Sequence, residues 1–430
     1  AATQRRSFGY DGLGFRRWED HPETELADIC TEDGCVPTAV HDREYPKYTP
    51  MGHLLQKKDG ETDLSYSYDR AGRLLTVRKT ATQEPVKAFT YDRLGGSAQG
   101  FSDGQIVRAS RTNHFAVAGG TANTLHTVEI LQDYSYSGRE GRVSSQSMRL
   151  KFDGEPDNND DERFAQSFGY DELGNVNSLT YPKCLFPACT NVTTGAGGGP
   201  DRTITYGYDQ GMLNNVHGYA TLSYAANGAL LRVAMANGKV WQQDKDANNM
   251  SRPRWICLKS VAAGDCVDGV DSWGPYEYDG IGNVKTIGGE SYRYDLLRRL
   301  VRGQLKDGSW QSYTYDPFGN VTATQSNLSG FGRSIPTNSA TNRLGGLASY
   351  DSNGSLLSWN GQQYEYDDLS QLSAIRNLDG GNSYYIYDAA GERVLTITLA
   401  TAAHPRHDRW TLRGLDGSVL RAFEATYSQT

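Results

Sequence analysis

The acidic and histidine-containing segments of this 430-residue chain are the first places to look for catalysis. The segment "EPDNNDDE", residues 155–162, offers paired carboxylates, but glycoside hydrolysis needs such a pair held at a fixed separation on rigid elements. Its composition is that of a solvated loop, and it does not match an EF-hand. "HPRHD", from His404 to Asp408, has a proline between its histidines and is typical of a surface segment. The sequence therefore predicts no catalytic residue, no metal site and no cofactor, and we expect that the chain is not an enzyme.

The six cysteines fall into three close pairs, namely Cys30 with Cys35, Cys184 with Cys189, and Cys257 with Cys266. Loops of this length can bring two Cα atoms to disulfide distance, and loop entropy gives roughly 2 kcal/mol for each short ring. His21 and His41 flank the first pair, but zinc sites usually have C-x2-C spacing. We therefore expect three disulfides and an oxidising compartment, with reduced structural cysteines or a metal as the alternatives.

A Tyr-Asp pattern recurs too often to be a catalytic motif. The dipeptide occurs eleven times, and in most copies a glycine follows three residues after the aspartate, as in "YEYDGIGNVKTI", residues 276–287. The predicted turn residues are Tyr10, Asp11, Gly14, Tyr68, Asp69, Gly72, Tyr170, Asp171, Gly174, Tyr278, Asp279, Gly282, Tyr315, Asp316, Gly319, Tyr350, Asp351, Gly354, Tyr387, Asp388 and Gly391. Further pairs are Tyr91-Asp92, Tyr208-Asp209, Tyr294-Asp295 and Tyr366-Asp367.

Each copy predicts a β-hairpin corner. Residues before the motif alternate large and polar, as in a half-buried strand. The aspartate can accept backbone N–H bonds, and the glycine can supply a positive φ. An aliphatic residue then starts the return strand, and tyrosine packs across the pair for about 0.2–1 kcal/mol per contact. Where the glycine is missing, as in "YDLLRR" and "YDDLSQ", we expect a different turn with the same strand pairing.

The spacing of the copies predicts one repeat array over residues 1–430. Steps of 16 and 21 residues between copies define a larger unit of about 36 residues. "SFGYDGLG" at Ser7 returns as "SFGYDELG" at Ser167, which indicates an ancestral duplication. We divide the array into residues 1–166, residues 167–274 with weak repeats, and residues 275–430 with the most regular repeats.

Composition fits an all-β chain. Glycine at 48 and tyrosine at 27 suit short strands and tight turns. A net charge of −8 with interspersed signs argues against nucleic acid as a partner. No apolar run is long enough for a membrane helix, and no signal peptide is recognisable. We expect a segment of a longer protein.

These residues resemble the YD repeats of the RHS family, found in Rhs effectors, the BC components of Tc toxins and teneurins. The resemblance rests on the Y-D-x-x-G-[RN]-[LV] matches and on the ending "RWTLRGLDGSVLRAFE" from Arg409. It implies a long, spiralling antiparallel sheet that forms a hollow shell, which in the toxin branches encloses a C-terminal toxin. No self-cleavage aspartates and no effector domain follow that ending, so neither activity is assigned.

We therefore expect a non-enzymatic, secreted or cell-surface protein that builds a β-sheet shell, with the rest of its own chain or an enclosed toxin as partner. The alternatives are an adhesion or carbohydrate-binding module, or a filament that self-associates through open sheet edges. In the second reading, exposed aromatic side chains would stack on glycans, and the candidates are Trp241, Trp255, Trp273, Trp310 and Trp359.

Overall fold

The computed structural model describes residues 4–24, 29–31, 34–36, 41–60, 62–119, 122–153, 162–184, 202–246, 250–260, 266, 271–378, 380–402 and 404–427. Its elements are β-strands apart from the 3-10 turn η1 (Pro22–Thr24) in this part of the chain. Two compact units are present, unit 1 with residues 1–168, 180–203 and 346–430, and unit 2 with residues 169–179 and 204–345.

The first sheet of unit 1 is a meander in which each strand pairs antiparallel with the next. Its strands are β1 (Ser7–Tyr10), β2 (Arg16–Asp20), β5 (Arg43–Tyr48), β6 (Leu54–Asp59), β7 (Thr62–Tyr68), β8 (Leu74–Lys79), β9 (Pro85–Tyr91), β12 (Ile106–Gly119), β13 (Ala122–Ser137), β14 (Arg142–Phe152) and β15 (Glu162–Tyr170). Two small hairpins, β3 (Ile29–Thr31) with β4 (Gly34–Val36) and β10 (Arg93–Leu94) with β11 (Ser97–Ala98), branch from it.

The second sheet of unit 1 has eight strands in sequence order. They are β33 (Ser349–Tyr350), β34 (Leu356–Trp359), β35 (Gln362–Tyr366), β36 (Leu372–Arg376), β37 (Ser383–Tyr387), β38 (Arg393–Thr398), β39 (Arg406–Arg413) and β40 (Val419–Tyr427). Strand β16 (Val176–Cys184) has residues in both units.

Unit 2 continues the same meander pattern. One sheet contains β17 (Thr203–Asp209), β18 (Met212–Val216), β19 (Ala220–Tyr224), β20 (Leu230–Met235), β21 (Lys239–Lys245), β22 (Pro253–Ser260) and β23 (Ser272–Trp273). The other contains β24 (Tyr276–Tyr278), β25 (Val284–Ile287), β26 (Glu290–Tyr294), β27 (Leu300–Gln304), β28 (Trp310–Tyr315), β29 (Val321–Ser326) and β30 (Arg333–Ser334). A short pair, β31 (Thr337–Asn338) and β32 (Arg343–Leu344), follows.

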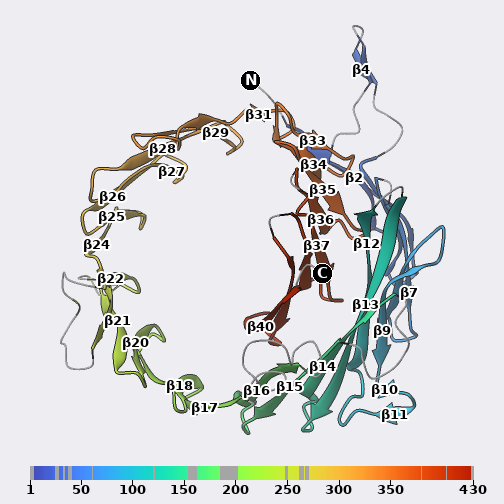
Figure 1. Ribbon diagram of the computed structural model, residues 1–430, viewed down its shortest axis with the longest axis horizontal. Helices are drawn as coiled ribbons and strands as arrows, with labels where there is room; N and C mark the ends of the chain where they lie inside the picture. Colours follow the sequence, from blue (N-terminus) through green and yellow to red (C-terminus); the bar gives the residue numbers. More distant parts are fainter. Residues whose placement is uncertain are drawn as a thin grey trace. The chain divides into compact units, whose positions relative to one another are not determined.

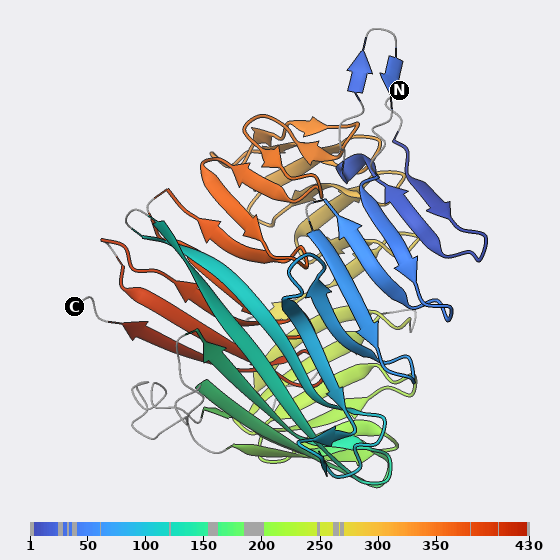
Figure 2. The ribbon, with the colours of Figure 1, turned by 90° about the vertical axis from the view of Figure 1, so that its right-hand side faces the viewer.

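The main core of unit 1 lies between its two sheets. Strands β36 to β40 face β12 to β15 there (Figure 1 and Figure 2). Val128, Ile130 and Leu150 from the first sheet belong to the same buried cluster as Tyr384 and Trp410 from the second. The period-2 alternation of strands puts these residues on one face of each sheet. Unit 1 is therefore a sandwich of two antiparallel sheets at this point.

Strands β12, β13 and β14 are longer than the strands of the regular repeats. β12, β13 and β14 have 14, 16 and 11 residues, and β12 pairs with β13 without a register break from Arg108 to Gly119. The turn from β13 to β14, in which the Gly141 amide donates to the Gly138 carbonyl, contains no Tyr-Asp pair. The prediction of an all-β fold made of tandem hairpins is confirmed by this strand order.

Candidate functional site in the repeat corners

The corner at Asp279 shows how the motif builds a turn. The Asp279 carboxylate accepts hydrogen bonds from the amides of Ile281 at 3.0 Å and Asn283 at 2.9 Å through one oxygen. The Asp279 carbonyl accepts from the Gly282 amide at 3.1 Å, and the Asp279 amide donates to the Asn283 carbonyl at 2.9 Å. Gly282 has a φ of 93°, which favours glycine. This is a type I turn followed by a left-handed residue and a bulge.

The strand register follows from that turn. Tyr278 lies opposite Val284, whereas Glu277 lies opposite Thr286, so one residue of the return strand is bulged out. The bulge accommodates the extra turn residue and keeps Tyr278 beside the aliphatic residue of the motif. Both ends of the motif are thereby fixed by one corner.

The same pair of backbone hydrogen bonds recurs at most predicted corners. In each, the aspartate amide donates to the carbonyl four residues later, and the amide three residues later donates back to the aspartate carbonyl. The corners are those of Asp11, Asp69, Asp171, Asp279, Asp295, Asp316, Asp351, Asp367 and Asp388. The structure thus places all seven predicted Tyr-Asp-Gly sets in one kind of turn.

Two Tyr-Asp pairs adopt other turns. Asp209 ends β17 and pairs with Met212 across a two-residue turn, in which Gln210 and Gly211 both have positive φ. Asp92 itself has a φ of 66°, and its amide donates to the Gln105 carbonyl. These corners differ because the glycine comes two residues after the aspartate in one case and the β10–β11 hairpin is inserted in the other.

The expectation of a different turn where glycine is missing is wrong. Arg298 and Ser370 occupy the glycine position with φ values of 63° and 59°. Their amides donate to the carbonyls of Asp295 and Asp367 at 3.0 and 2.9 Å, as the glycines do elsewhere. The aspartate hydrogen bonds therefore hold even a side-chain-bearing residue in the left-handed region, which costs roughly 1–2 kcal/mol.

We predict that Arg298→Gly stabilises the protein. Relief of the left-handed strain exceeds the added backbone entropy of glycine, so the free energy of unfolding should rise by about 1 kcal/mol. Gly282→Ala is the matched opposite, because open space surrounds the position and only φ opposes the methyl group. Urea unfolding of both variants tests this, and an unchanged or lower midpoint for Arg298→Gly would contradict it.

Several repeat tyrosines tie their hairpin to the one before it. The Tyr315 hydroxyl donates at 2.7 Å to the carbonyl of Leu300, the residue that faces Tyr294 in the preceding hairpin. The same step joins Tyr68 to Leu54, Tyr91 to Leu74, Tyr208 to Val176, Tyr224 to Leu213 and Tyr387 to Leu372. Burial raises the pKa of Tyr68, which keeps its hydroxyl protonated as a donor. Tyrosine thus connects neighbouring repeats, whereas aspartate shapes one corner.

The residue after the glycine position contacts the second carboxylate oxygen. Asn283 donates from its side chain to Asp279 at 2.8 Å, and Arg299 donates to Asp295 at 2.7 Å. Arg299 also lies over the Tyr315 ring, 4.5 Å from its centroid. Asparagine and arginine are therefore both accepted in the motif because each can donate to the aspartate.

Arg73 joins two corners electrostatically. Its guanidinium donates to Asp69 at 2.6 Å and to both oxygens of Asp92 at 2.9 Å. The side-chain hydrogen bonds from Arg73, together with the Gly104 amide, lower the pKa of Asp92 to about 2. A depressed carboxyl pKa stabilises the fold above the unfolded value of about 3.9, and that contribution is lost as the pH falls toward about 2.

We predict that Arg73→Met raises the pKa of Asp92 toward about 3.9. Carboxyl-carbon NMR titration of aspartate-labelled protein measures this change. Asp316, whose pKa is lowered first by its hydrogen bond from Asn320, is the internal control and should keep its titration midpoint. A midpoint for Asp92 that does not move would show that Arg73 is not the main cause.

A buried polar cluster in unit 1 was not predicted. Arg111 of β12, with 1% of its side chain exposed, donates to the Asp367 carboxylate and to the Gln371 side chain. It also donates to the Asp388 carbonyl at 3.3 Å and lies over the Tyr387 ring. One arginine therefore holds two repeat corners of the second sheet.

Neighbouring strands complete this cluster. The Gln132 side chain of β13 donates to the Asp388 carboxylate at 3.1 Å, and Asn113 accepts from the Tyr387 amide at 3.0 Å. Burial raises the pKa of Asp388 and lowers that of Lys87. The available sequence signal is the alternation of β12, which puts Arg111 and Asn113 in phase with buried Val107, Ala109 and Phe115.

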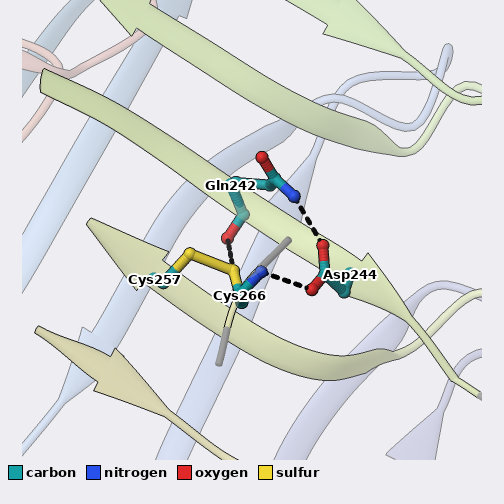
Figure 3. Close-up of a disulfide and its surroundings, with 4 residues drawn as sticks. All are labelled: Gln242, Asp244, Cys257 and Cys266. Atoms are coloured by element: carbon teal, nitrogen blue, oxygen red, sulfur yellow. Dashed lines mark hydrogen bonds between the residues drawn. A yellow bond between two sulfur atoms is a disulfide. The ribbon is translucent and has the colours of Figure 1, made fainter. Parts of the chain in front are cut away.

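One of the three predicted cysteine pairs is described in full, and the other two are described in part. Cys257 and Cys266 form a disulfide with Cα atoms 5.7 Å apart (Figure 3). The backbones of Cys30 and Cys35 face each other across β3 and β4, but their side chains lie outside the described residues. Cys184 is disulfide-bonded, and Cys189 lies outside the described residues.

The "HPRHD" and "EPDNNDDE" segments show no catalytic arrangement in the part of the chain that the structure describes. Asp408 is buried and accepts from Arg406, while His407 lies 3.7 Å from Glu424. Residues 155–161 lie outside the described part. Where the chain is described, no group of three or more potential ligands is placed to hold a metal ion, and no helix is long and apolar enough to span a membrane.

The candidate sugar-stacking tryptophans do not share one exposure. Trp273 is exposed, whereas Trp241, Trp255, Trp310 and Trp359 are half-buried. The Trp310 ring is covered by Arg302, 4.3 Å from its centroid. These side chains therefore serve packing at least in part.

Tandem antiparallel hairpins, aspartate corners and tyrosine links between repeats define a YD-repeat β-sheet protein. The model of the Teneurin YD-shell family matches residues 282–398, which confirms the resemblance to YD-repeat shells. No curated protein sequence matches the chain.

Solved structures of Tc toxins are similar in fold. The Photorhabdus luminescens Tc holotoxin pore, in a mutant form, is 16% identical, with a TM-score of 0.59 over 94% of this chain and 22% of the toxin chain. The TcdB2-TccC3 crystal structure is 17% identical, with a TM-score of 0.58 over 95% of this chain and 23% of that chain. The chain thus has the fold of a YD-repeat shell and spans about a quarter or less of these toxin chains.

Proposed function

We propose that this chain is part of the wall of a secreted or cell-surface β-sheet shell that encloses another polypeptide. The observation that carries the proposal is the tyrosine link, because the tyrosines of several repeats bond their hairpin to the hairpin before it. A sheet built in this way can be extended without limit, which suits a wall. The likeness to Tc toxin structures supports the same role.

The chemistry of the repeats fits a structural role. The repeat aspartates are engaged by backbone amides and by arginine or asparagine, so their carboxylates are used in holding corners. The pKa of Asp69 is lowered first by the hydrogen bond from the Arg73 amide, as expected for a carboxylate that caps a turn. The disulfide between Cys257 and Cys266 suits an oxidising environment.

Protease protection of native particles tests this proposal. If the wall encloses a polypeptide, a second protein should survive digestion of intact particles and be degraded once the particles are unfolded. The same particles mixed with a free marker protein provide the control, since the marker should be degraded in both cases. Absence of any protected polypeptide would contradict enclosure.

A further inference from the structure

One repeat corner in unit 1 is covered by the other sheet, and its contacts show what binds such a corner. In the turn Asp367–Ser370, the Asp367 carboxylate accepts from Arg111, and Asp368 lies 3.2 Å from the Lys79 ammonium. Leu369, between them, packs against the apolar cluster of Leu64, Val77 and Val86. An acidic turn with a leucine tip is therefore held by two cations around an apolar patch.

The corner Asp171–Gly174 in unit 2 has the same chemistry and is uncovered. Its sequence, Asp-Glu-Leu-Gly, matches Asp-Asp-Leu-Ser at the covered corner in both acids and in the leucine. Leu173 is 79% exposed. Within the described part of the chain, Glu172 has no side-chain partner. Leu173 and Glu172 are thus the counterparts of the leucine and the acid that the covered corner packs and pairs.

A groove across β19 to β22 in unit 2 offers the complementary chemistry. Its volume of about 670 Å³ lies within the range of ligand sites, about 300–1,000 Å³. Arg232, Lys245 and Arg254 line it, are exposed, and have no hydrogen-bond or ion-pair partner among the described residues. Leu231 and Trp255 supply apolar surface beside them. Three free cations around apolar side chains repeat the environment of the covered corner.

The acid within the groove is already engaged. The Asp244 carboxylate accepts from the Gln242 side chain at 2.6 Å and from the Cys266 amide at 2.8 Å (Figure 3). The disulfide links Cys266, which carries that amide donor, to Cys257 on β22. The three cations are therefore free to bind an incoming acid.

We propose that the groove of one copy of this chain binds the Asp171–Gly174 corner of a second copy. Glu172 pairs with the arginines and lysine of the groove, and Leu173 contacts Leu231 and Trp255, while Asp171 keeps its hydrogen bonds to Asn175 and shapes the corner. Because corner and groove are different surfaces, the contact is heterologous and copies add head to tail. This association goes beyond the wall role and does not depend on enclosed cargo.

Sedimentation velocity of the whole chain over a range of concentrations tests the proposal. The wild type should associate in a concentration-dependent manner, and high salt should weaken the association. Leu173→Asp, and separately Arg232→Glu with Arg254→Glu, should each weaken association about tenfold or more. A mixture of these two variants retains one intact corner and one intact groove, so it should form a dimer and no larger species.

Matched controls separate the contact from general effects of charge. Leu13→Asp changes an equally exposed leucine, 78% exposed, in a corner that lacks the second acid, and should associate like the wild type. Lys239→Glu reverses the charge of an exposed lysine outside the groove and should also associate like the wild type. If Leu173→Asp lowers the thermal midpoint of unfolding, Glu172→Lys is used as the corner variant in its place. A wild type that stays monomeric, or corner and groove variants that associate like the wild type, would overturn the proposal.

Discussion

Arg111→Met should lower the free energy of unfolding of unit 1 by about 3–5 kcal/mol, the cost of breaking a buried ion pair by removing one partner. The arginine is 1% exposed, and its loss leaves the Asp367 carboxylate and the Asp388 carbonyl buried with fewer donors. Methionine is apolar and fills much of the same volume, so the main loss is that of the guanidinium. Urea unfolding followed by intrinsic fluorescence measures the change.

Arg70→Met is the control for Arg111→Met, because Arg70 is an exposed corner arginine with no partner among the described residues. Its substitution should change stability by less than about 0.5 kcal/mol. Asp367→Asn with and without Arg111→Met completes a double-mutant cycle, which isolates the coupling between the two groups. A loss at Arg111 no larger than that at Arg70 would show that the cluster does not hold the sheets together.

Trp410→Ala should lower the free energy of unfolding by about 3–5 kcal/mol. Trp410 is 2% exposed in the core between the two sheets, and it lies opposite Leu395 on one side and Phe423 on the other. Alanine would leave a cavity that neighbouring strands cannot close without shifting the register. Thermal and urea unfolding both report the loss.

Trp273→Ala provides the comparison for Trp410→Ala, since that indole is 51% exposed at the end of the β22–β23 pair. We expect a change of less than about 1 kcal/mol there, because little apolar surface is withdrawn from water in the folded state. Equal effects at the two tryptophans would contradict the assignment of the core to the space between the sheets.

The hairpins were predictable because their signals are local. Asp279 and Gly282 are three residues apart, and the turn that joins them depends on φ preferences and short hydrogen bonds that a sequence records directly. The error at Arg298 has the same origin, because a preference for glycine was taken as a requirement. The corner hydrogen bonds outweigh the strain of one left-handed residue.

The contacts between sheets were not predictable from the repeat. Arg111 and Asp367 are separated by 256 residues, and nothing in the Tyr-Asp pattern indicates which corner a distant strand will cover. The hydrogen bonds of the tyrosine hydroxyls are less predictable than the corners and more predictable than the contacts between sheets. Tyr315 and Leu300 are 15 residues apart, so the regular spacing could have suggested that each tyrosine reaches the previous hairpin.

Electron microscopy of the native protein, purified without reducing agent and with an intact mass taken on the same sample, tests the central claim most directly. A wall segment predicts a hollow particle with a mass well above 47.4 kDa and with density inside that the wall does not supply. Isolated sheets with the mass of one chain, or fibres built from that chain alone, would have no interior and would contradict the claim that this chain encloses another polypeptide.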